Sequence, residues 1–297
     1  MSNSVSASSG VGLNFGRIAG RVLVLGTLAL FVLYFLAPLF VMITTSLKSM
    51  PEIRAGNIIS LPRDPSFEAW RVAWQEACVG VECPGIRGFY KNTFLMVIPA
   101  VTVSTLLGAI NGFALTKYRF TGHRLVFGLF MFGCFIPHQA IILPMARALG
   151  MMDLSGSLWG LALVHTVYGI PFTTMFFRNY YISIPQELVK AARVDGAGFF
   201  RIFWSIMLPI SAPIIIVSVI WQFTNIWNDF LFGASFTYGA NAPIMVALNN
   251  IVNTSTGERP YNVHMAAAIM AALPTLVIYV LAGRYFVRGL VAGSVKG

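Results

Sequence analysis

Six long apolar stretches constrain this chain more than any other feature of its sequence. Each approaches the roughly 20 mainly apolar residues that a helix needs to cross a bilayer core of about 30 Å. Hydrophobic residues make up 57% of the 297 positions and charged residues only 10%, whereas soluble domains carry about 25% charged residues. We therefore predict an all-α, polytopic integral membrane protein with six transmembrane helices, surrounded by membrane lipid. The predicted spans are 22–45, 92–116, 125–143, 158–177, 206–231 and 265–286.

The distribution of charge predicts the orientation of these spans. Residues 1–21, the segments 117–124 and 178–205, and the C-terminal tail would share one side, with twelve of the 20 Lys and Arg residues and two of the ten Asp and Glu residues. That side has a net charge of +10, while the other side, with eight residues of each sign, is neutral. Because an excess of Lys and Arg marks the cytoplasmic side, both termini are predicted to be cytoplasmic.

Two further expectations follow from these segments. The first span is expected to be retained and not cleaved as a signal peptide, because its apolar run is too long and no small-x-small site follows it. The basic residues lie thinly between apolar runs and form no patch with aromatic stacking platforms, so nucleic acid is not an expected partner.

The predicted outer segment 46–91 contains two of the three cysteines. Cys78 and Cys83 are separated by four residues, a spacing that suits either a local disulfide or half of a zinc site. No other Cys or His neighbours them in the segment, and an oxidising compartment favours the disulfide. We expect no metal site, and Cys134 in the third span is expected to serve in packing.

The predicted inner segment 180–205 is long for a connection between two spans, yet its pattern is helical. Ser183 and Gln186 have the spacing of a capping box, in which a hydroxyl and an amide side chain satisfy free backbone groups at a helix start. Gly196 is a natural helix stop. A second amphipathic stretch follows, so the segment predicts a helix–turn–helix.

One face of the first of these helices would carry Leu188, Ala191 and Ala192. Small side chains there would allow a partner protein to approach closely. An amphipathic helix that rests on lipid has the same spacing, so the pattern alone is compatible with both interpretations.

A motif within this segment favours the first interpretation. Residues 190–196 read Lys-Ala-Ala-Arg-Val-Asp-Gly, and after nine further residues 206–209 read Ile-Met-Leu-Pro. This resembles the cytoplasmic signature loop of binding-protein-dependent ABC importers, which reads Glu-Ala-Ala, three residues, Gly, nine residues, Ile-x-Leu-Pro. The spacing matches throughout, and only the first residue differs, because Lys190 stands where the family has Glu.

Weaker matches in the same order extend the resemblance over almost the whole chain, towards the carbohydrate branch and its maltose-type second permease. They lie at 46–48, 61–62, 137 with 144, 184–188, 227–229 and 292–297. The resemblance implies a single transmembrane domain over 1–297, placed in a bacterial inner membrane. Its implied partners are a second homologous permease, a dimer of ATPase subunits and a periplasmic sugar-binding protein.

In that family the signature loop forms a coupling helix that docks in a cleft of the ATPase. Lys190 inverts a charge at this interface, and either Glu187 one turn earlier or an acid on the cognate ATPase would compensate. The chain has no phosphate-binding glycine–lysine loop, so ATP and Mg are expected on the partner ATPase, with no cofactor and no catalysis in this chain. The coupling residues implied are Glu187, Lys190, Ala191, Ala192, Asp195, Gly196 and Ala197.

Polar residues within the predicted spans are the candidates for a translocation pathway. Gln222, Asn225, Asn228 and Asp229 recur at roughly helical spacing, and His165 lies deep in the fourth span. Amides and carboxylates of this kind recognise sugars, but the same stripe would also suit the interface with a sister subunit. A self-contained carrier or channel that uses His165 or Asp229 is the alternative to an ABC permease, since such carriers need ionisable groups in the membrane.

Three further expectations concern other positions. Gly108 and Gly112 flank Asn111 at a small-xxx-small spacing, which predicts close helix packing. By resemblance, Asn249, Asn250 and Asn253 in the turn-rich polar outer loop 233–264 would contact the sugar-binding protein. The segments 227–233 and 247–250 resemble glucose- or mannose-type permeases, so glucose or a related hexose is the expected substrate.

Overall fold

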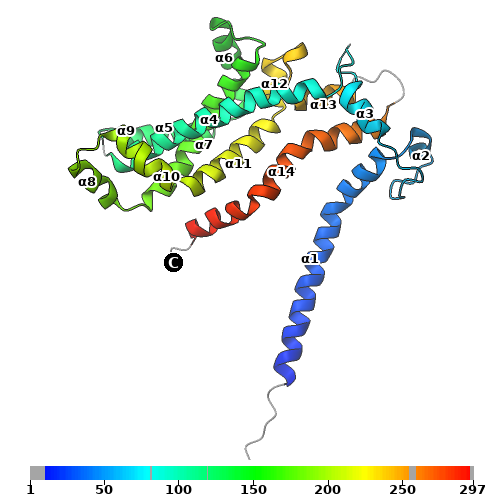
Figure 1. The fold of residues 1–297 in the computed structure, drawn as a ribbon, viewed down its shortest axis with the longest axis horizontal. Helices are drawn as coiled ribbons and strands as arrows, with labels where there is room; N and C mark the ends of the chain where they lie inside the picture. Colours follow the sequence, from blue (N-terminus) through cyan, green and yellow to red (C-terminus); the bar gives the residue numbers. More distant parts are fainter. Residues whose placement is uncertain (1–10, 81, 119, 254–258, 295–297) are drawn as a thin grey trace, which may run out of the picture. The chain divides into compact units, whose positions relative to one another are not determined.

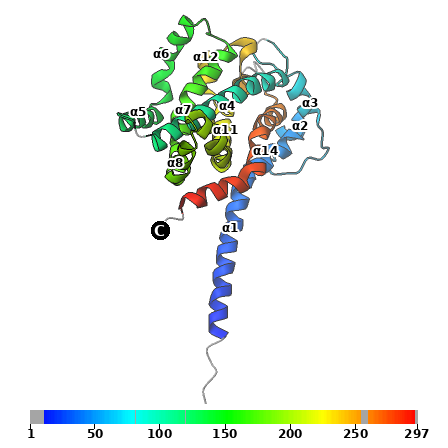
Figure 2. The ribbon, with the colours of Figure 1, turned by 60° about the vertical axis from the view of Figure 1, so that its left-hand side comes forward.

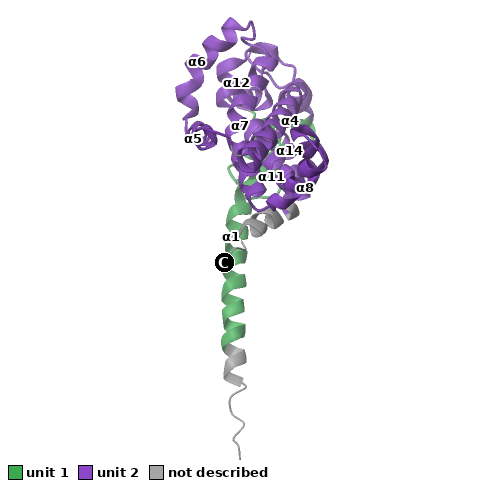
Figure 3. Ribbon diagram, turned by 90° about the vertical axis from the view of Figure 1, so that its left-hand side faces the viewer, with its two compact units in different colours: residues 1–70, 260–269 green, residues 71–259, 270–297 purple. Residues whose placement is uncertain are grey.

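The computed structural model describes residues 11–80, 82–118, 120–253 and 259–294, with the side chains of 11–15 and 284–294 excepted. These residues form helices, and no β-strand occurs among them. The chain divides into two compact units, residues 1–70 with 260–269 and residues 71–259 with 270–297 (Figure 3). The all-α class predicted from the sequence is confirmed.

The first unit is built on a long apolar helix, α1 (Val11–Ser46), followed by α2 (Met50–Arg54). The section Gly16–Ser46 is long and apolar enough to cross a membrane, and its most apolar part is exposed. Residues 11–21, which precede the predicted first span, belong to this helix, and residues 1–10 lie outside the described part.

Lys48, which is 3% exposed, orders the loop that follows α1 through hydrogen bonds. Its Nζ donates to the carbonyl of Asn57 at 3.1 Å and to Ser60 Oγ at 3.0 Å, and its own carbonyl accepts from Asn262 Nδ2 at 3.1 Å. The Trp70 indole donates to Ser46 Oγ at 3.1 Å. The beginning of the predicted outer segment 46–91 is thus ordered by hydrogen bonds to buried polar groups.

The second unit is built around the pair α4 (Arg87–Lys117) and α7 (Leu158–Ile182) (Figure 1). A Cβ added at Gly108 would lie 2.3 Å from Thr173 Oγ1, and one added at Gly112 would lie 2.7 Å from the Arg178 backbone nitrogen. Only glycine permits this approach of the two backbones. The predicted packing role of Gly108 and Gly112 is confirmed.

The third predicted span, 125–143, is not one straight helix. Helices α5 (His123–Cys134) and α6 (His138–Met151) are bent by 104° at the break before His138. Pro137 begins the new direction, since the residue before a proline avoids helical angles and proline suits a helix start. Figure 2 shows α5 beside α7, and residue contacts join the two.

The fifth predicted span, 206–231, is broken as well. A short helix α9 (Phe199–Ile202) passes through a π-helical turn (Phe203–Met207) into α10 (Leu208–Ile210), and α11 (Ala212–Trp227) then leaves at an angle of 79°. The fifth span is therefore this bent pair, Phe199–Ile210 with Ala212–Trp227, and not one straight helix over 206–231. Ser211 marks the bend, and its hydroxyl donates to Tyr181 Oη at 2.8 Å.

Four helices of the described chain are long and apolar enough to cross a membrane, and the number is six when each bent pair counts as one span. Short helices occur between them in the sequence: α3 (Glu68–Gln75), α8 (Gln186–Val194), α12 (Leu231–Phe236), a 3-10 turn (Gly239–Asn241) and α13 (Ile244–Asn253). The last long helix is α14 (Tyr261–Ser294). The six-span prediction is confirmed in this sense.

The prediction of a polar loop over 233–264 is wrong for most of its length, because α12, the 3-10 turn, α13 and the start of α14 lie within it. Apolar residues at helical spacing, among them Ile244, Ala247 and Ile251, bury one face of α13. Backbone groups are paired across the fold: the amide of Ile244 donates to Thr93 Oγ1 on α4 at 2.8 Å. Residues 254–258 lie outside the described part.

Candidate functional site

Helix α8, within the segment 180–205, has one face built into the core of the second unit. Val189 is fully buried and Ala192 is 9% exposed, and both belong to a hydrophobic cluster with Phe113 of α4, Tyr181 of α7 and Phe203. Phe113 is also 4.9 Å, ring centre to ring centre, from Phe199 of α9. The helix is therefore attached to the ends of the two central helices by packing.

The opposite face of α8 is exposed. It carries Leu188 and Val194, which are 45% and 87% exposed, although both are apolar. Five of the predicted coupling residues are exposed with them, while Ala192 faces inward and Ala197 is half-buried; the exposed five are Glu187, Lys190, Ala191, Asp195 and Gly196. The predicted face of Leu188, Ala191 and Ala192 thus divides: the first two are exposed, and Ala192 packs against the core.

The turn after α8 depends on Gly196, whose φ of +77° lies in the left-handed region. The Gly196 amide donates to the carbonyl of Arg193 at 3.0 Å, and the Ala197 amide donates to that of Ala192 at 2.9 Å. Both bonds satisfy carbonyls at the helix end, as in a glycine-terminated helix. The predicted helix–turn–helix is confirmed, with α9 as its second helix.

The predicted capping box at the start of α8 is wrong. Pro185 occupies the N-cap, and no side chain caps the helix. The Ser183 hydroxyl donates instead to the carbonyl of Tyr180 at 2.7 Å, and Gln186 Nε2 donates to the carbonyl of Lys117 at 3.3 Å. The Ser183 hydroxyl thus satisfies a carbonyl at the end of α7. The Gln186 amide joins α8 to α4.

Lys117 at the end of α4 completes this connection. Its Nζ donates to the carbonyl of Ile184 at 2.5 Å, and its side chain is 6% exposed. The Arg193 guanidinium lies 4.2 Å from the ring centre of Tyr118, a cation–π contact. Helix α8 is therefore joined to α4 and α7 by packing, by hydrogen bonds and by a cation–π contact.

The predicted polar stripe of α11 separates into groups with different surroundings. Gln222 is 2% exposed, and its Nε2 donates to Ser104 Oγ on α4 at 2.7 Å. A Cβ added at Gly169 of α7 would lie 1.9 Å from the same Nε2. Gln222 therefore joins three helices at a point of close packing, whereas Asn225 and Asn228 are exposed.

Asp229 lies just beyond α11, two residues before α12 begins at Leu231. Its Oδ2 accepts from the backbone amides of Phe232 at 3.0 Å and Gly233 at 3.2 Å, which are free donors at the start of α12. Burial raises the pKa of the Asp229 carboxyl, and the hydrogen bonds from Gly233 and Phe232 oppose that rise. The Asp229 carboxylate thus caps the start of α12 by accepting these two backbone hydrogen bonds.

His165 faces the same carboxylate. Its Nε2 lies 3.7 Å from Asp229 Oδ2, the side chain is 6% exposed, and Nε2 has no hydrogen-bond partner among the described residues. The structure therefore brings together His165 and Asp229, two of the predicted pathway residues. The aromatic ring of Phe232 is 5.7 Å from that of His165.

Two further residues of this cluster, His138 and Tyr168, were not among the site residues predicted from the sequence. His138 at the start of α6 stacks on Tyr168, with ring centres 4.3 Å apart, and its ring centre is 5.0 Å from that of Phe232. The Tyr168 hydroxyl donates to the carbonyl of Ile136 at 2.6 Å. Pro137 was the available signal, since a proline favours a helix start and so places His138 at the beginning of α6.

We expect Asp229→Ala to destabilise the chain by about 1–2 kcal/mol, the usual cost of losing an N-terminal cap. Asn228→Ala is the matched control, because Asn228 is exposed and adjacent. Thermal unfolding of the detergent-solubilised protein would show a lower midpoint for the first variant alone. Equal midpoints for both variants would remove the capping role from Asp229.

The remaining predicted site residues lie in other parts of the second unit. Cys78 and Cys83 are joined by a disulfide. Asn249, Asn250 and Asn253 belong to α13, where Asn253 Nδ2 donates to the Asn249 carbonyl at 2.9 Å. They lie on a helix and not in the polar loop expected, with Asn253 exposed and the other two half-buried.

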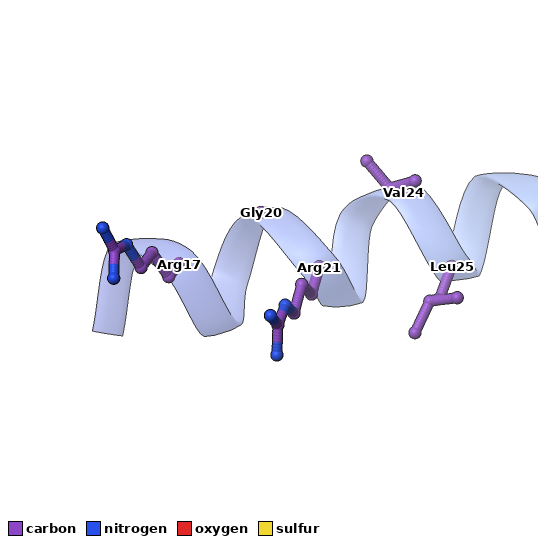
Figure 4. Close-up of a pocket in the computed structure, with 5 residues that line it drawn as sticks. All are labelled: Arg17, Gly20, Arg21, Val24 and Leu25. Atoms are coloured by element: carbon purple, nitrogen blue, oxygen red, sulfur yellow. The ribbon is translucent and has the colours of Figure 1, made fainter. Parts of the chain in front are cut away.

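A surface hollow on α1 does not provide a second site. Figure 4 shows its lining residues, all on the one helix, and no second element of the described chain encloses them. Arg17 and Arg21 are exposed there near the start of the apolar run. The residues are Arg17, Gly20, Arg21, Val24 and Leu25.

Comparison with known proteins identifies the family. A family model described as the binding-protein-dependent transport system inner membrane component matches residues 90–290. The chain belongs to this family, as the signature loop indicated. It is 37% identical over 265 residues to a probable ABC transporter permease protein of Pyrococcus horikoshii, covering 89% of this chain and 93% of the relative.

A second relative and a solved structure extend the comparison. The chain is 31% identical over 298 residues to the xylose/arabinose import permease protein of Haloferax volcanii, covering 94% of this chain and 93% of that protein. A chain of a bacterial ABC transporter involved in the import of the acidic polysaccharide alginate matches with a TM-score of 0.78 at 22% identity, over 95% of this chain and 100% of that chain. That structure shares the fold.

Proposed function

We propose that this chain is a membrane-spanning subunit of an ATP-driven carbohydrate importer and forms half of its translocation pathway. The observation that carries the proposal is the two-sided character of α8. Its inner face, with Val189 and Ala192, packs in the hydrophobic core, while Leu188 and Val194 on the outer face are exposed. Exposed apolar side chains beside charged ones are typical of a surface that another protein covers.

The partner that suits this surface is a cytosolic ATPase subunit that carries ATP and Mg. The family membership and the signature spacing support this assignment, which makes α8 the coupling helix. Glu187 and Asp195 would pair with basic groups of the ATPase, and Lys190 with an acidic one. This chain would supply no catalytic group of its own.

In the mechanism that we propose, closure of the ATPase dimer moves α8, and the contacts around Phe113 and Lys117 transmit the movement to α4 and α7. A second, homologous permease would form the other half of the pathway. A periplasmic binding protein would deliver the sugar to the outward-facing state, with α13 and its Asn249, Asn250 and Asn253 as a contact surface. The termini would be cytoplasmic, in a bacterial inner membrane.

The substrate class proposed is carbohydrate. The Haloferax volcanii relative is named for xylose and arabinose, which are pentoses. Glucose or a related hexose therefore remains one prediction among several sugars. We infer that His165 and Asp229, whose Nε2 and Oδ2 atoms lie 3.7 Å apart, line the pathway, whereas Gln222 serves helix packing.

Uptake assays test this proposal directly. Proteoliposomes that contain the chain, its co-expressed transporter subunits and binding protein would be supplied with ATP and labelled glucose, mannose, xylose or arabinose. We expect accumulation of at least one sugar only with internal ATP. Accumulation by this chain alone, driven by an ion gradient without ATP, would instead support the self-contained carrier.

A further inference from the structure

A basic cavity of about 560 Å³ lies where three membrane helices of the second unit end. Its walls come from the end of α4, the start of α5, the end of α7 and the connection into α8. The helix ends at Lys117, His123 and Ile182 place it at the boundary between the apolar spans and water. This level is where phospholipid headgroups lie.

Three basic side chains line the cavity: Lys117, Arg124 and Arg178. No acidic residue is among its described lining residues, although Glu187 is near enough to interact electrostatically with Lys117. Neither guanidinium forms an ion pair with any described residue. The positive charge of the cavity is therefore largely uncompensated, and an anion would supply the missing partner.

The geometry of these groups suits a phosphodiester. The Arg178 guanidinium lies over the Phe127 ring, with its Cζ 3.8 Å from the ring centre, which holds it in place. One Nη donates to Asn179 Oδ1 at 3.5 Å, and the guanidinium has further N–H donors for an anion. Lys117 donates one hydrogen to the Ile184 carbonyl, which leaves two of its three donors. Guanidinium groups bind phosphate oxygens through two parallel hydrogen bonds.

The apolar surface beside the cavity suits acyl chains. Ile182 on α7 lines the cavity and is 57% exposed, and the half-buried Phe127 on α5 lines it as well. The cavity thus combines basic residues at headgroup level with apolar side chains from α5 and α7 in the same wall. A free phosphate ion would use only the first of these features.

We propose that this cavity binds the headgroup of an anionic phospholipid such as phosphatidylglycerol, with its acyl chains against α5. Basic pockets between membrane helices are a known setting for anionic lipid headgroups. The site is separate from the exposed face of α8 and from the cluster of His165 and Asp229.

The test measures phosphatidylglycerol binding to the detergent-solubilised chain by native mass spectrometry, with phosphatidylcholine of the same chain length as reference. We expect the unaltered chain to prefer phosphatidylglycerol. The double variant Arg124→Gln, Arg178→Gln should bind it about tenfold more weakly, from the loss of two charges. The matched control is Arg201→Gln, which removes an exposed charge on α9 outside the cavity.

Each alternative outcome is decisive. Equal affinity for both lipids, unchanged binding by the double variant, or an equal loss in Arg201→Gln would overturn the proposal. Competition by millimolar inorganic phosphate without lipid preference would assign the site to a free anion. If the double variant elutes as an aggregate, the single variant Arg124→Gln is tested instead, because Arg124 is exposed. About threefold weaker binding of phosphatidylglycerol by this variant supports the site, and unchanged binding refutes it. Lipid binding is measured without transport, so this result is independent of the proposed function.

Discussion

Replacing Gly108 with leucine is expected to prevent the chain from accumulating as a folded membrane protein. The first added carbon would lie 2.3 Å from Thr173 Oγ1 and 2.7 Å from the Thr173 backbone carbonyl carbon. A side chain can rotate away, but the backbone of α7 cannot, so the two helices must separate. We expect a loss of about 3 kcal/mol or more, since overpacking a well-packed core costs about 1–3 kcal/mol and here the obstacle is backbone.

The separation would also break polar contacts at the same level. Thr173 Oγ1 donates to the Ser104 carbonyl at 2.8 Å, and Gln222 donates to Ser104 Oγ. The matched control is Gly128→Leu in α5, where an added Cβ meets nothing within 4 Å. Quantitative immunoblots of purified membranes should show a severe loss for Gly108→Leu and a normal level for Gly128→Leu. Normal levels of both would show that α4 and α7 do not need this close approach.

The second large effect concerns the turn after α8. Gly196→Val is expected to reduce ATP-driven uptake about tenfold while the chain remains in the membrane. The left-handed backbone at Gly196, φ +77°, costs a residue with a side chain about 1–2 kcal/mol, and most for a β-branched one. An added Cβ meets nothing within 4 Å, so the effect would come from backbone strain that re-orients the exposed end of α8.

Two comparison variants separate strain from bulk. Gly198→Val introduces the same side chain two residues later, where φ is −77° and an added Cβ also meets nothing within 4 Å. Gly196→Asn keeps a residue that tolerates left-handed angles. Uptake and ATP hydrolysis by reconstituted transporters should be near normal in both. If Gly198→Val lost as much uptake as Gly196→Val, the conformational explanation would fail.

Much of the fold could be predicted from the sequence because lipid imposes simple requirements. Runs of about 20 apolar residues indicate helices, and Gly108 with Gly112 indicates close packing. The bends at His138 and Ser211 could not be predicted from hydropathy, since a broken pair has the same composition as a straight span. Their directions depend on contacts with distant residues, such as the hydrogen bond between Ser211 and Tyr181.

The candidate site was predicted in part. The spacing of the signature loop predicted α8 and its turn, because both are local features. It could not show that Ala192 faces the core while Ala191 is exposed, since that depends on the cluster around Phe113. His138 escaped notice because the bend that brings it to Tyr168 was not predicted, and α13 was mistaken for a loop because turn residues flank it.

Co-purification tests the central claim most directly. A tagged chain would be isolated from detergent-solubilised native membranes, alongside Val194→Asp, which places a charge on the exposed face of α8. We predict that the unaltered chain brings down an ATPase and a second permease, and that Val194→Asp loses the ATPase but keeps the permease. A chain that purifies alone, and that transports in liposomes without ATP, would contradict the account.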